Sequence, residues 1–401
     1  MLESTTTDLK TQFSDKKWTA KYPDVGQGLV STESCTSEEQ FERERDLIFR
    51  RHWLNVGRVE EVANPADYFV RELEVCRTSI LVVRGKDGVI RAFHNVCPHR
   101  GNTLVWQERG NCPGRFGCNF HSWAFDTEGN LASVSDEENF FDFDKSKRNL
   151  KSVHCDVWAG FIFIHLAAEP AETLREFLGG VATQLDGCPF DQTRLIRKYT
   201  CEEAANWKTG LDAQNELYHL PFQHRYTIGD ALVLKDSKYC RFSNVNLYNY
   251  HSVWSCEYNP EHKQLPTEAI LSRFDTGNSH VRMPQIIGHF DWYCIFPNMA
   301  LLLWQGKTWD FVMTYNFWPL AVDRCIWEMR YYFPVAENTG QRLAQEWTLC
   351  RLRDTLMEDA FAHEQIQKGL MSGAYSDMVM QDEEITIRHF HEVLDRQMAR
   401  G

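Results

Sequence analysis

The sequence has no excess of basic residues: 43 lysines and arginines stand against 56 aspartates and glutamates, a formal net charge of −13. A protein that binds DNA or RNA needs a basic face, so nucleic acid is not an expected partner. The sequence also has no uncharged apolar run approaching the roughly 18 residues of a membrane span. Its N-terminal stretch, MLESTTTDLKTQFSDKK, lacks the apolar core of a signal peptide. These absences predict a soluble, cytoplasmic protein without a membrane partner.

Disulfide bonds are not expected either, although cysteine itself is frequent. The chain has 13 cysteines, an odd number, so they cannot all pair with one another. In a cytoplasmic protein we expect reduced thiols, and a tight group of cysteines then indicates a metal site. With 401 residues, the chain is long enough for two domains or for one large domain with a smaller one attached.

The N-terminal half shows a change from helical to strand periodicity. Thr36 and Glu39 form a candidate capping box, which predicts a helix through residues 39–53. Strand patterns begin at Asp67, and the last of them covers residues 160–166. A small β-rich domain is therefore expected after the first helix.

The C-terminal half has a mixed pattern. Residues 202–219 favour a helix, residues 240–335 favour strands, and a long helix is expected from about Thr339 to Lys368, with Gly369 as its C-cap. We therefore expect an α+β protein in three parts. These are an N-terminal arm and helix packing on the larger domain (1–55), a β-rich domain (56–166) and the larger domain itself (167–401).

One stretch of the β-rich part, VCPHRGNTLVWQERGNCPGRFGCNFHSW, concentrates metal-binding residue types. Each half of it supplies one cysteine and one histidine, whereas zinc sites usually separate the two ligand types. The mixture is what a Rieske [2Fe–2S] cluster needs, because two thiolates hold one iron and two imidazoles hold the other. The candidate cluster residues are Cys97, His99, Cys118 and His121.

Two alternatives stay open for this stretch. The first is that the four residues bind a single zinc ion. Cys112 lies between the two halves of the stretch but outside the ligand pattern, and we interpret it as a residue that binds no metal. The other alternative concerns the whole protein, because a Rieske domain alone would be a non-catalytic electron carrier. That alternative leaves more than half of the chain without a role.

A second candidate metal site lies in NWKTGLDAQNELYHLPFQHRY. Glu216 and His219 are three residues apart and would share one face of the expected helix. His224 would point elsewhere on an ideal helix, but Pro221 should end or kink the helix and bring it back. Two such histidines need one carboxylate to form the 2-His-1-carboxylate site of non-haem Fe(II).

The long C-terminal helix offers that carboxylate. Asp359 lies in the expected buried stripe, whereas Glu358 and Glu364 would point away from it. A buried carboxylate must be paired, protonated or metal-bound, so we interpret Asp359 as an iron ligand; a salt bridge with Arg351 or Arg353 is the alternative. The stripe follows spacings of three and four: Leu349, Leu352, Leu356, Asp359, His363, Ile366 and Leu370.

The sequence resembles the large (α) subunits of Rieske non-haem iron oxygenases, which include ring-hydroxylating dioxygenases and related monooxygenases. The resemblance extends from near Glu38 to about Leu370 and rests on CPHRGN, CNFHSW, NWK, ELYHLPFQH and EDAFAHEQIQKGL. It implies a Rieske domain beside a catalytic domain with a large antiparallel sheet flanked by helices. By match to the family's motifs it implies two ligand sets: Cys97, His99, Cys118 and His121 for the cluster, and His219, His224 and Asp359 for the catalytic iron.

The resemblance also implies partners. Electrons would come from NAD(P)H through a separate flavin reductase, in some members with a ferredoxin. Glu216 matches the carboxylate that connects the catalytic iron to the cluster of a neighbouring subunit, which implies a homotrimer, with or without a small β subunit. Many members have Asp there, and Glu occurs in members similar to carnitine monooxygenases. Ala213 is a second departure, because Asn often follows the acidic residue that matches Asp212.

The substrate pocket is expected on the aromatic strands at residues 289–297 and 301–311. Trp292, Trp304 and Trp309 would fit a flat aromatic substrate or a cation–π cage for a quaternary ammonium group, and core packing is the structural alternative for each. We favour hydroxylation of an aromatic or other hydrophobic compound, in NADH-dependent aromatic catabolism. The alternative is a monooxygenase that acts on a quaternary amine or demethylates an N-methyl or O-methyl substrate.

Overall fold

The computed structural model describes residues 17–228, 231–232, 237, 239–263, 265–274, 281–306 and 309–400. The chain forms two compact units. Arg45–Phe177 make up the first, here called the β unit, and Met1–Glu44 together with Leu178–Gly401 make up the second, the mixed unit. No helix in the described residues is long and apolar enough to cross a membrane.

The β unit contains a seven-stranded antiparallel sheet and a smaller three-stranded sheet. In spatial order the large sheet consists of β2 (Leu54–Arg58), β11 (Phe161–His165), β10 (Ser152–Trp158), β5 (Ile90–His94), β4 (Thr78–Arg84), β3 (Asp67–Leu73) and β6 (Arg109–Asn111). The small sheet consists of β7 (Phe116–Gly117), β8 (Ala124–Phe125) and β9 (Leu131–Ser133). The unit ends with α5 (Leu174–Leu178) at its boundary.

The helix expected at residues 39–53 is confirmed in part. It consists of α4 (Glu38–Glu44) and a π-helical segment (Arg45–Phe49), so it ends before residue 53, and a separate short helix, α3 (Glu33–Thr36), precedes it. The residue that caps α4 is Ser37, whose hydroxyl accepts a hydrogen bond from the Gln40 amide at 3.2 Å. The Thr36 hydroxyl donates to the carbonyl of Thr32 at 3.0 Å and is not available as a cap. Ser37 has the extended backbone of an N-cap residue, which ends α3 and lets α4 begin anew.

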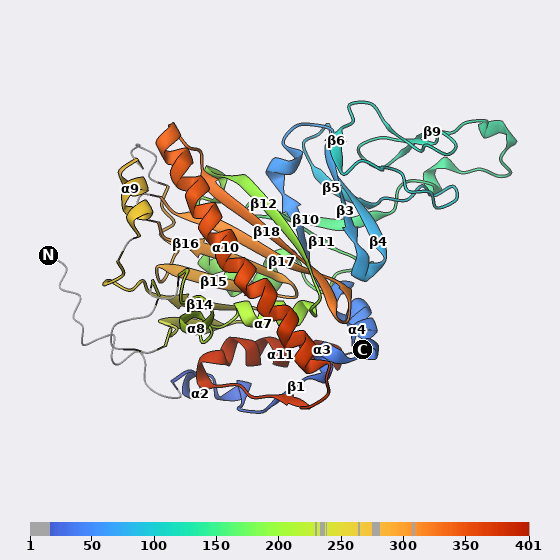
Figure 1. The fold of residues 1–401 in the computed structure, drawn as a ribbon. Coiled ribbons are helices and arrows are strands. Elements are labelled where there is room, and N and C mark those ends of the chain that lie inside the picture. The colour runs from blue at the N-terminus through green and yellow to red at the C-terminus, as the bar shows by residue number, and fades with distance from the viewer. Residues whose placement is uncertain are drawn as a thin grey trace. The chain divides into compact units, whose positions relative to one another are not determined.

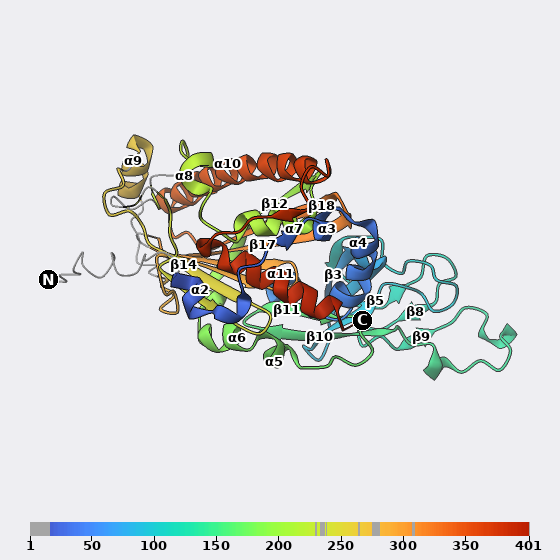
Figure 2. The ribbon, with the colours of Figure 1, turned by 90° about the horizontal axis from the view of Figure 1, so that it is seen from below.

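The mixed unit is built around a second seven-stranded antiparallel sheet. Figure 1 shows α10 (Thr339–Leu370) crossing this sheet, and Figure 2 shows α7 (Trp207–Gln214) between α10 and α11 (Ile385–Met398). The order of the strands is β12 (Thr193–Glu203), β18 (Arg324–Pro334), β17 (Phe311–Ala321), β16 (Met299–Trp304), β15 (Phe290–Ile295), β14 (Ser252–Cys256) and β13 (Asn244–Leu247). The short helix α6 (Gly180–Gln184) belongs to the same unit.

The strand register of this sheet collects large aromatic side chains on one face. Trp254 pairs with Trp292, and Trp292 pairs with Leu302. Phe290 pairs with Trp304 and lies two residues before Trp292, so it shares that face. One aromatic patch therefore extends over three neighbouring strands.

The buried face of α10 agrees with the expected stripe in its first part and departs from it near its end. Leu349, Asp359 and His363 are buried, but Ile366 is 44% exposed, so its place in the stripe is wrong. The buried residue in the last turns is Gln367, whose amide accepts from the Asn206 N–H and donates to the Cys35 carbonyl, both at 3.0 Å. Gln367, a polar residue with satisfied hydrogen bonds, is therefore buried where the spacing of apolar residues predicted that Ile366 would be.

Candidate functional site

Two loops of the β unit repeat one hydrogen-bond pattern. In the first, the Cys97 amide donates to the Asn102 carbonyl at 2.8 Å and the Gly101 amide donates to the Cys97 carbonyl at 3.0 Å. In the second, the Cys118 amide donates to the Trp123 carbonyl at 2.8 Å and the Ser122 amide to the Cys118 carbonyl at 2.9 Å. Gly101 and Ser122 occupy matching positions and both have positive φ, 79° and 57°. Each cysteine therefore begins an equivalent tight turn.

The two turns bury their cysteines and leave their histidines near the surface. Cys97 is 2% exposed and Cys118 3%, and both belong to the hydrophobic core of the unit. The rings of His99 and His121 are partly exposed, with centroids 4.6 Å apart. His99 stacks on Trp123 with ring centroids 4.8 Å apart and planes inclined by 10°. This arrangement of two inner sulfurs and two outer imidazoles fits a [2Fe–2S] unit with unlike irons.

The two cysteines differ in their electrostatic surroundings. Burial raises the pKa of Cys97 to about 11. Burial acts in the same direction on Cys118, but hydrogen bonds from the Phe120 backbone and the Asn102 side chain outweigh it and lower the pKa of that thiol. The Asn102 amide lies 3.5 Å from the Cys118 sulfur. Donors directed at a sulfur are already in place for a thiolate.

The arrangement of the two turns does not match a zinc site. In the part of the chain that the structure describes, only one group of three or more His, Cys, Asp or Glu side chains could hold a single ion, and it lies in the mixed unit. The four residues of the two turns are therefore not gathered around one ion, as a zinc site would require. Cys112 packs against the core of the unit, and its amide donates to the Ala66 carbonyl at 2.9 Å.

The group in the mixed unit consists of His219, His224 and Asp359, whose ligand atoms lie within 4.8 Å of one another. The Nε2 atom of His224 is 2.9 Å from Oδ1 of Asp359, and Nε2 of His219 is 3.8 Å from the same oxygen. Asp359 is 2% exposed. The structure thus brings together two imidazole nitrogens and one carboxylate from distant parts of the sequence, which is the donor set suited to non-haem iron.

The local backbone differs from the expected helix at residues 202–219. The helix α7 covers only Trp207–Gln214, so Glu216 and His219 do not share a helix face. The two histidines instead flank the short helix α8 (Leu220–Gln223), with His219 as its N-cap and His224 as its C-cap. Pro221 lies in the first turn of α8, where it is tolerated, and the chain has already left the preceding helix before it.

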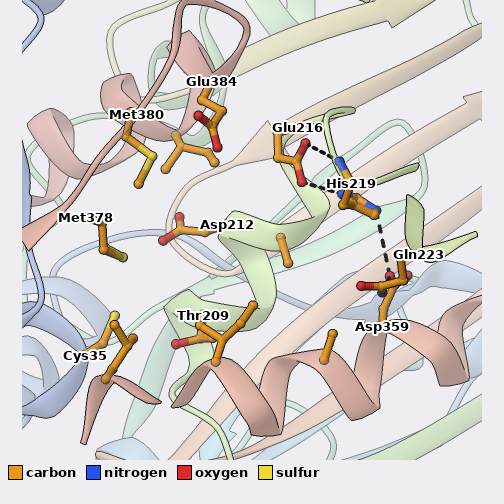
Figure 3. A pocket seen from close by; sticks show the side chains of 15 residues that line it. Cys35, Thr209, Asp212, Glu216, His219, Gln223, Asp359, Met378, Met380 and Glu384 are labelled. Carbon is orange, nitrogen blue, oxygen red and sulfur yellow. Dashed lines mark hydrogen bonds and ion pairs between the residues drawn. The ribbon is translucent and has the colours of Figure 1, made fainter. Parts of the chain in front are cut away.

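Each histidine has a second carboxylate at its other ring nitrogen. Nδ1 of His219 is hydrogen-bonded to Glu216 (Figure 3), and Nδ1 of His224 lies 2.7 Å from Oε2 of Glu358. Because Nδ1 is engaged in both rings, Nε2 is the nitrogen free to bind a metal. Glu358 lies outside the buried stripe of α10, as expected, but its side chain still contacts His224, which helical spacing did not indicate.

The arginines considered as salt-bridge partners of Asp359, and the nearby carboxylate of Glu364, have other contacts. Arg351 donates to the Thr227 carbonyl at 2.7 Å, and Arg353 pairs with Asp354 at 2.6 Å. Glu364 accepts from the Ala204 amide at 3.2 Å. Asp359 is instead contacted by the side-chain amide of Gln223 at 2.6 Å, a contact that helical periodicity could not indicate.

The electrostatic interactions within this group shift the pKa values of all three residues. Burial lowers the pKa of both histidines, but nearby carboxylates outweigh it. Glu216 and Asp359 raise the pKa of His219 above its usual value, and Asp359 does the same for His224. Burial raises the pKa of Asp359, but the hydrogen bond and charge of His224 outweigh it and lower that pKa. The cluster therefore favours an ionised carboxylate among buried imidazoles, and a bound divalent cation would take the place of the histidine protons.

An aromatic cavity of about 60 Å³ adjoins these three residues. Trp292 and Trp304 line it, as expected, whereas Trp309 packs against Phe311 and Phe333 and is not part of its lining. Trp254, Phe290, Trp292 and Trp304 share the aromatic face of β14, β15 and β16, whereas Trp309 precedes β17 and belongs to no strand. The other aromatic residues of the lining are Trp254, Phe290 and Tyr315.

A second cavity, of about 180 Å³, lies on another side of the same group. Glu216, His219 and Asp359 line both cavities. Figure 3 shows the second cavity with Asp212 and Glu384 among its walls. The histidine–carboxylate group is thus accessible from an aromatic space and from a space with acidic side chains.

Comparison with known proteins identifies the family. Residues 190–400 match the ring hydroxylating alpha subunit (catalytic domain), and residues 52–152 match the Rieske [2Fe-2S] domain. The chain belongs to the Rieske non-haem iron oxygenases. Its cofactors are accordingly a Rieske [2Fe–2S] cluster and a mononuclear iron, and it is the terminal component of such an oxygenase.

Several relatives of this Rieske oxygenase have named substrates. The carnitine monooxygenase oxygenase subunit of Escherichia coli K12 is 31% identical over 370 residues, which are 90% of this chain and 91% of that protein. The glycine betaine monooxygenase oxygenase subunit of Pseudomonas aeruginosa (strain UCBPP-PA14) is 29% identical over 248 residues, 62% of this chain and 56% of that protein. A quaternary ammonium Rieske monooxygenase, solved in a study of carnitine oxidation by gut microbiota and inter-subunit electron transfer, has a TM-score of 0.76 and 23% identity, covering 96% and 98% of the two chains. The last comparison confirms the expected fold.

Proposed function

We propose that this Rieske oxygenase is a monooxygenase of a small quaternary ammonium or N-methylated compound. The observation that carries the proposal is the aromatic cavity beside His219, His224 and Asp359. This was the alternative in the sequence interpretation, and the names of the carnitine and glycine betaine relatives favour it over the aromatic substrate that was preferred there.

The chemistry of the cavity suits a cation without acidic protons. Faces of Trp, Tyr and Phe attract a quaternary ammonium group through the ring quadrupole, and such a group needs no hydrogen-bond acceptor. Charged lining residues among those described are Glu216 and Asp359, with the histidines His219 and His224, and none is a lysine or arginine. A cationic group therefore meets no lysine or arginine in that part of the wall.

A neutral aromatic substrate is the second candidate. The matched family is described as ring hydroxylating, and the same tryptophans could pack against a flat ring. This candidate predicts turnover that does not require a positive charge on the substrate, and the two candidates are therefore separable by experiment.

We propose that Cys97, His99, Cys118 and His121 hold the cluster, and that His219, His224 and Asp359 hold the mononuclear iron. A bound iron of this kind supplies the open coordination positions at which O₂ is activated. The chain's own residues hold it: Glu216 and Glu358 orient the two imidazoles, and the aromatic cavity excludes water from the substrate.

Electrons would reach the cluster from an NAD(P)H-dependent flavin reductase. We propose that Glu216 then connects the catalytic site to the cluster of a neighbouring subunit in a homotrimer. The contact between Glu216 and Nδ1 of His219 supports the connection to the catalytic site. The connection to a neighbouring subunit is supported by the inter-subunit electron transfer that is named for a structurally similar monooxygenase.

A substrate panel with a surrogate reductase tests the proposal. The purified protein should first be shown to be brown and to contain about three irons per chain, two in the cluster and one mononuclear. Tetramethylammonium, choline, glycine betaine and carnitine are compared with naphthalene, toluene and benzoate, and both NADH oxidation and product mass are measured. We expect coupled product formation from at least one quaternary ammonium compound. Product from the aromatic compounds alone would overturn the proposal.

Matched variants show whether the cavity recognises the charge. Trp292→Leu removes an aromatic face from the cavity, and Trp309→Leu removes a tryptophan that packs elsewhere. We expect Trp292→Leu to raise KM for the quaternary substrate by roughly 2- to 30-fold, since a cation–π contact contributes about 0.5–2 kcal/mol. Trp309→Leu should leave KM near the wild-type value.

A further inference from the structure

The oxygenase reaction consumes protons at a buried site. Monooxygenation follows RH + O₂ + 2e⁻ + 2H⁺ → ROH + H₂O, and cis-dihydroxylation likewise takes up two electrons and two protons. The electrons come from the reductase through the cluster, but they bring no protons with them. Asp359 and His224 are each 2% exposed, whereas the half-buried His219 lines the second cavity, so that cavity is a route by which water reaches the iron-binding group.

The second cavity has a position and a size that suit proton supply. Its volume of about 180 Å³ is well above the roughly 10–15 Å³ that one water molecule requires. One end is lined by His219, Gln223 and Asp359, and another part of its wall carries Asp212 and Glu384 (Figure 3). A file of waters in this space would extend from the iron-binding group to two carboxyl groups that do not contact that group.

Asp212 is held in the cavity wall by a histidine from another helix. Its Oδ2 atom lies 2.7 Å from Nε2 of His391, which belongs to α11. Asp212 is 9% exposed, and its Oδ1 atom has no hydrogen-bond partner among the described residues. Asp212 also lines the second cavity, so waters there lie beside a carboxylate whose hydrogen-bonding capacity is not filled by the described residues.

Glu384 has one oxygen in use and one side turned to the cavity. Its Oε2 accepts from the Gln381 amide at 2.7 Å, which fixes the carboxyl group in place. Burial raises its pKa to about 7, and the charges of Glu216 and Asp212 add to this, whereas Arg388 opposes it. Near neutral pH the group therefore exchanges its proton readily, as a proton donor in catalysis must.

We propose that Glu384 and the Asp212–His391 pair form a proton-supply path, which delivers protons through waters of the second cavity to the iron-binding site. Glu384 releases a proton to the water file and is reprotonated from solvent, while Asp212 orders the waters. The proposal rests on the oxygenase class of the protein and not on the identity of its substrate.

The first variant is Glu384→Gln, tested in the holoenzyme with a substrate from the panel. Glutamine can still accept the Gln381 amide, so the local turn is preserved while the exchangeable proton is lost. Because general acid–base groups contribute about 10²–10⁴-fold, we expect turnover to fall by roughly 10-fold or more, with a larger solvent deuterium isotope effect. Metal content should not change. Turnover within about 2-fold of the wild type with an unchanged isotope effect would overturn the proposal.

Glu383→Gln is the matched control. This neighbouring glutamate is buried, whereas Glu384 is half-buried; it accepts from the Phe242 amide at 2.9 Å and the Trp18 indole at 3.2 Å, and it does not line the cavity. Its replacement tests the effect of losing a buried carboxylate in the same turn. The isotope effect should stay at the wild-type value even if stability falls.

An infrared titration supplies a readout that needs no turnover. The wild-type protein should show a protonated-carboxyl band that disappears as pH rises through about 7, and the band should be absent in Glu384→Gln. If Glu384→Gln does not fold, the same titration of the wild type and of Asp212→Asn tests the proton-supply path instead. A shifted midpoint in Asp212→Asn supports the path, and absence of the band in the wild type overturns it. Because this test uses no substrate, failure of the substrate proposal does not affect it.

Discussion

The two candidate metal sites of this Rieske oxygenase are assembled in different ways. In the β unit, each half of the site is a short turn in which a cysteine and a histidine are neighbours, and the two turns share one hydrogen-bond pattern. In the mixed unit, the histidines come from the ends of α8, while Asp359 comes from α10; Gln223 and Asp359, in direct contact, are 136 positions apart. Local geometry thus determines most of the first site, and packing between elements determines the second.

Removing Asp359 should have the largest effect, because it removes the one proposed ligand that joins α10 to α8. We expect Asp359→Ala to lose the mononuclear iron and all measurable product, a larger loss than the roughly 10–100-fold typical when an outer partner of a metal ligand is removed. The brown colour of the cluster should remain. Iron analysis and visible spectra check this, with Glu364→Ala as control on the same helix. Full activity in Asp359→Ala would show that the carboxylate ligand had been misassigned.

Removing Cys97 should produce the opposite pattern. Cys97→Ala is expected to lose the cluster and its colour, because a [2Fe–2S] unit requires both thiolates on one iron. The mononuclear iron should remain, since its proposed ligands belong to the other unit. Cys112→Ser is the control and should keep colour and activity. Loss of both metals in Cys97→Ala would indicate that the two sites do not form independently.

Glu216→Gln tests whether the contact with His219 serves electron transfer. We expect both metals to be retained, because glutamine still accepts a hydrogen bond from Nδ1, while oxidation of the cluster in a single turnover becomes much slower. A surface glutamate without this role would change stability by about 0.5 kcal/mol or less and leave turnover unaffected. Rapid-mixing spectroscopy of the reduced enzyme with substrate and O₂ measures the rate. Wild-type cluster oxidation in the variant, or a fully active monomer, would contradict the inter-subunit bridge.

Glu358→Gln should have the smallest effect of the four. Glu358 orients His224 from 2.7 Å and also accepts from the Thr227 hydroxyl at 3.0 Å, and glutamine can keep part of this pattern. We expect iron affinity to fall by about 10-fold, at the lower end for partners of metal ligands. Competition with a chelator measures the affinity, and Asp354→Asn, an exposed carboxylate on the same helix, is the control. An affinity equal to that of the wild type would mean that packing alone orients His224.

Residue patterns predicted the two cofactors that the family assignment supports. The alternation of one cysteine and one histidine indicated a Rieske cluster, and helical spacing correctly placed Asp359 on the buried face of α10. The same spacing failed for Ile366, because Gln367 has hydrogen-bond partners that make its burial favourable. Periodicity counts apolar residues and cannot register a polar residue whose partners come from other elements.

Short-range patterns also left the surroundings of the iron-binding group undetermined. The chain leaves the helical path after Gln214, Glu358 reaches His224, and Trp254 joins Trp292 in the aromatic cavity, although none of these features has a local signature. Each depends on strands and helices that meet only when the sheet and α10 are packed together. Turns are specified by neighbouring residues, whereas cavities and charge pairs depend on contacts between residues that are remote in the chain. The pocket and the cavity of the proposed proton path are therefore determined by tertiary packing.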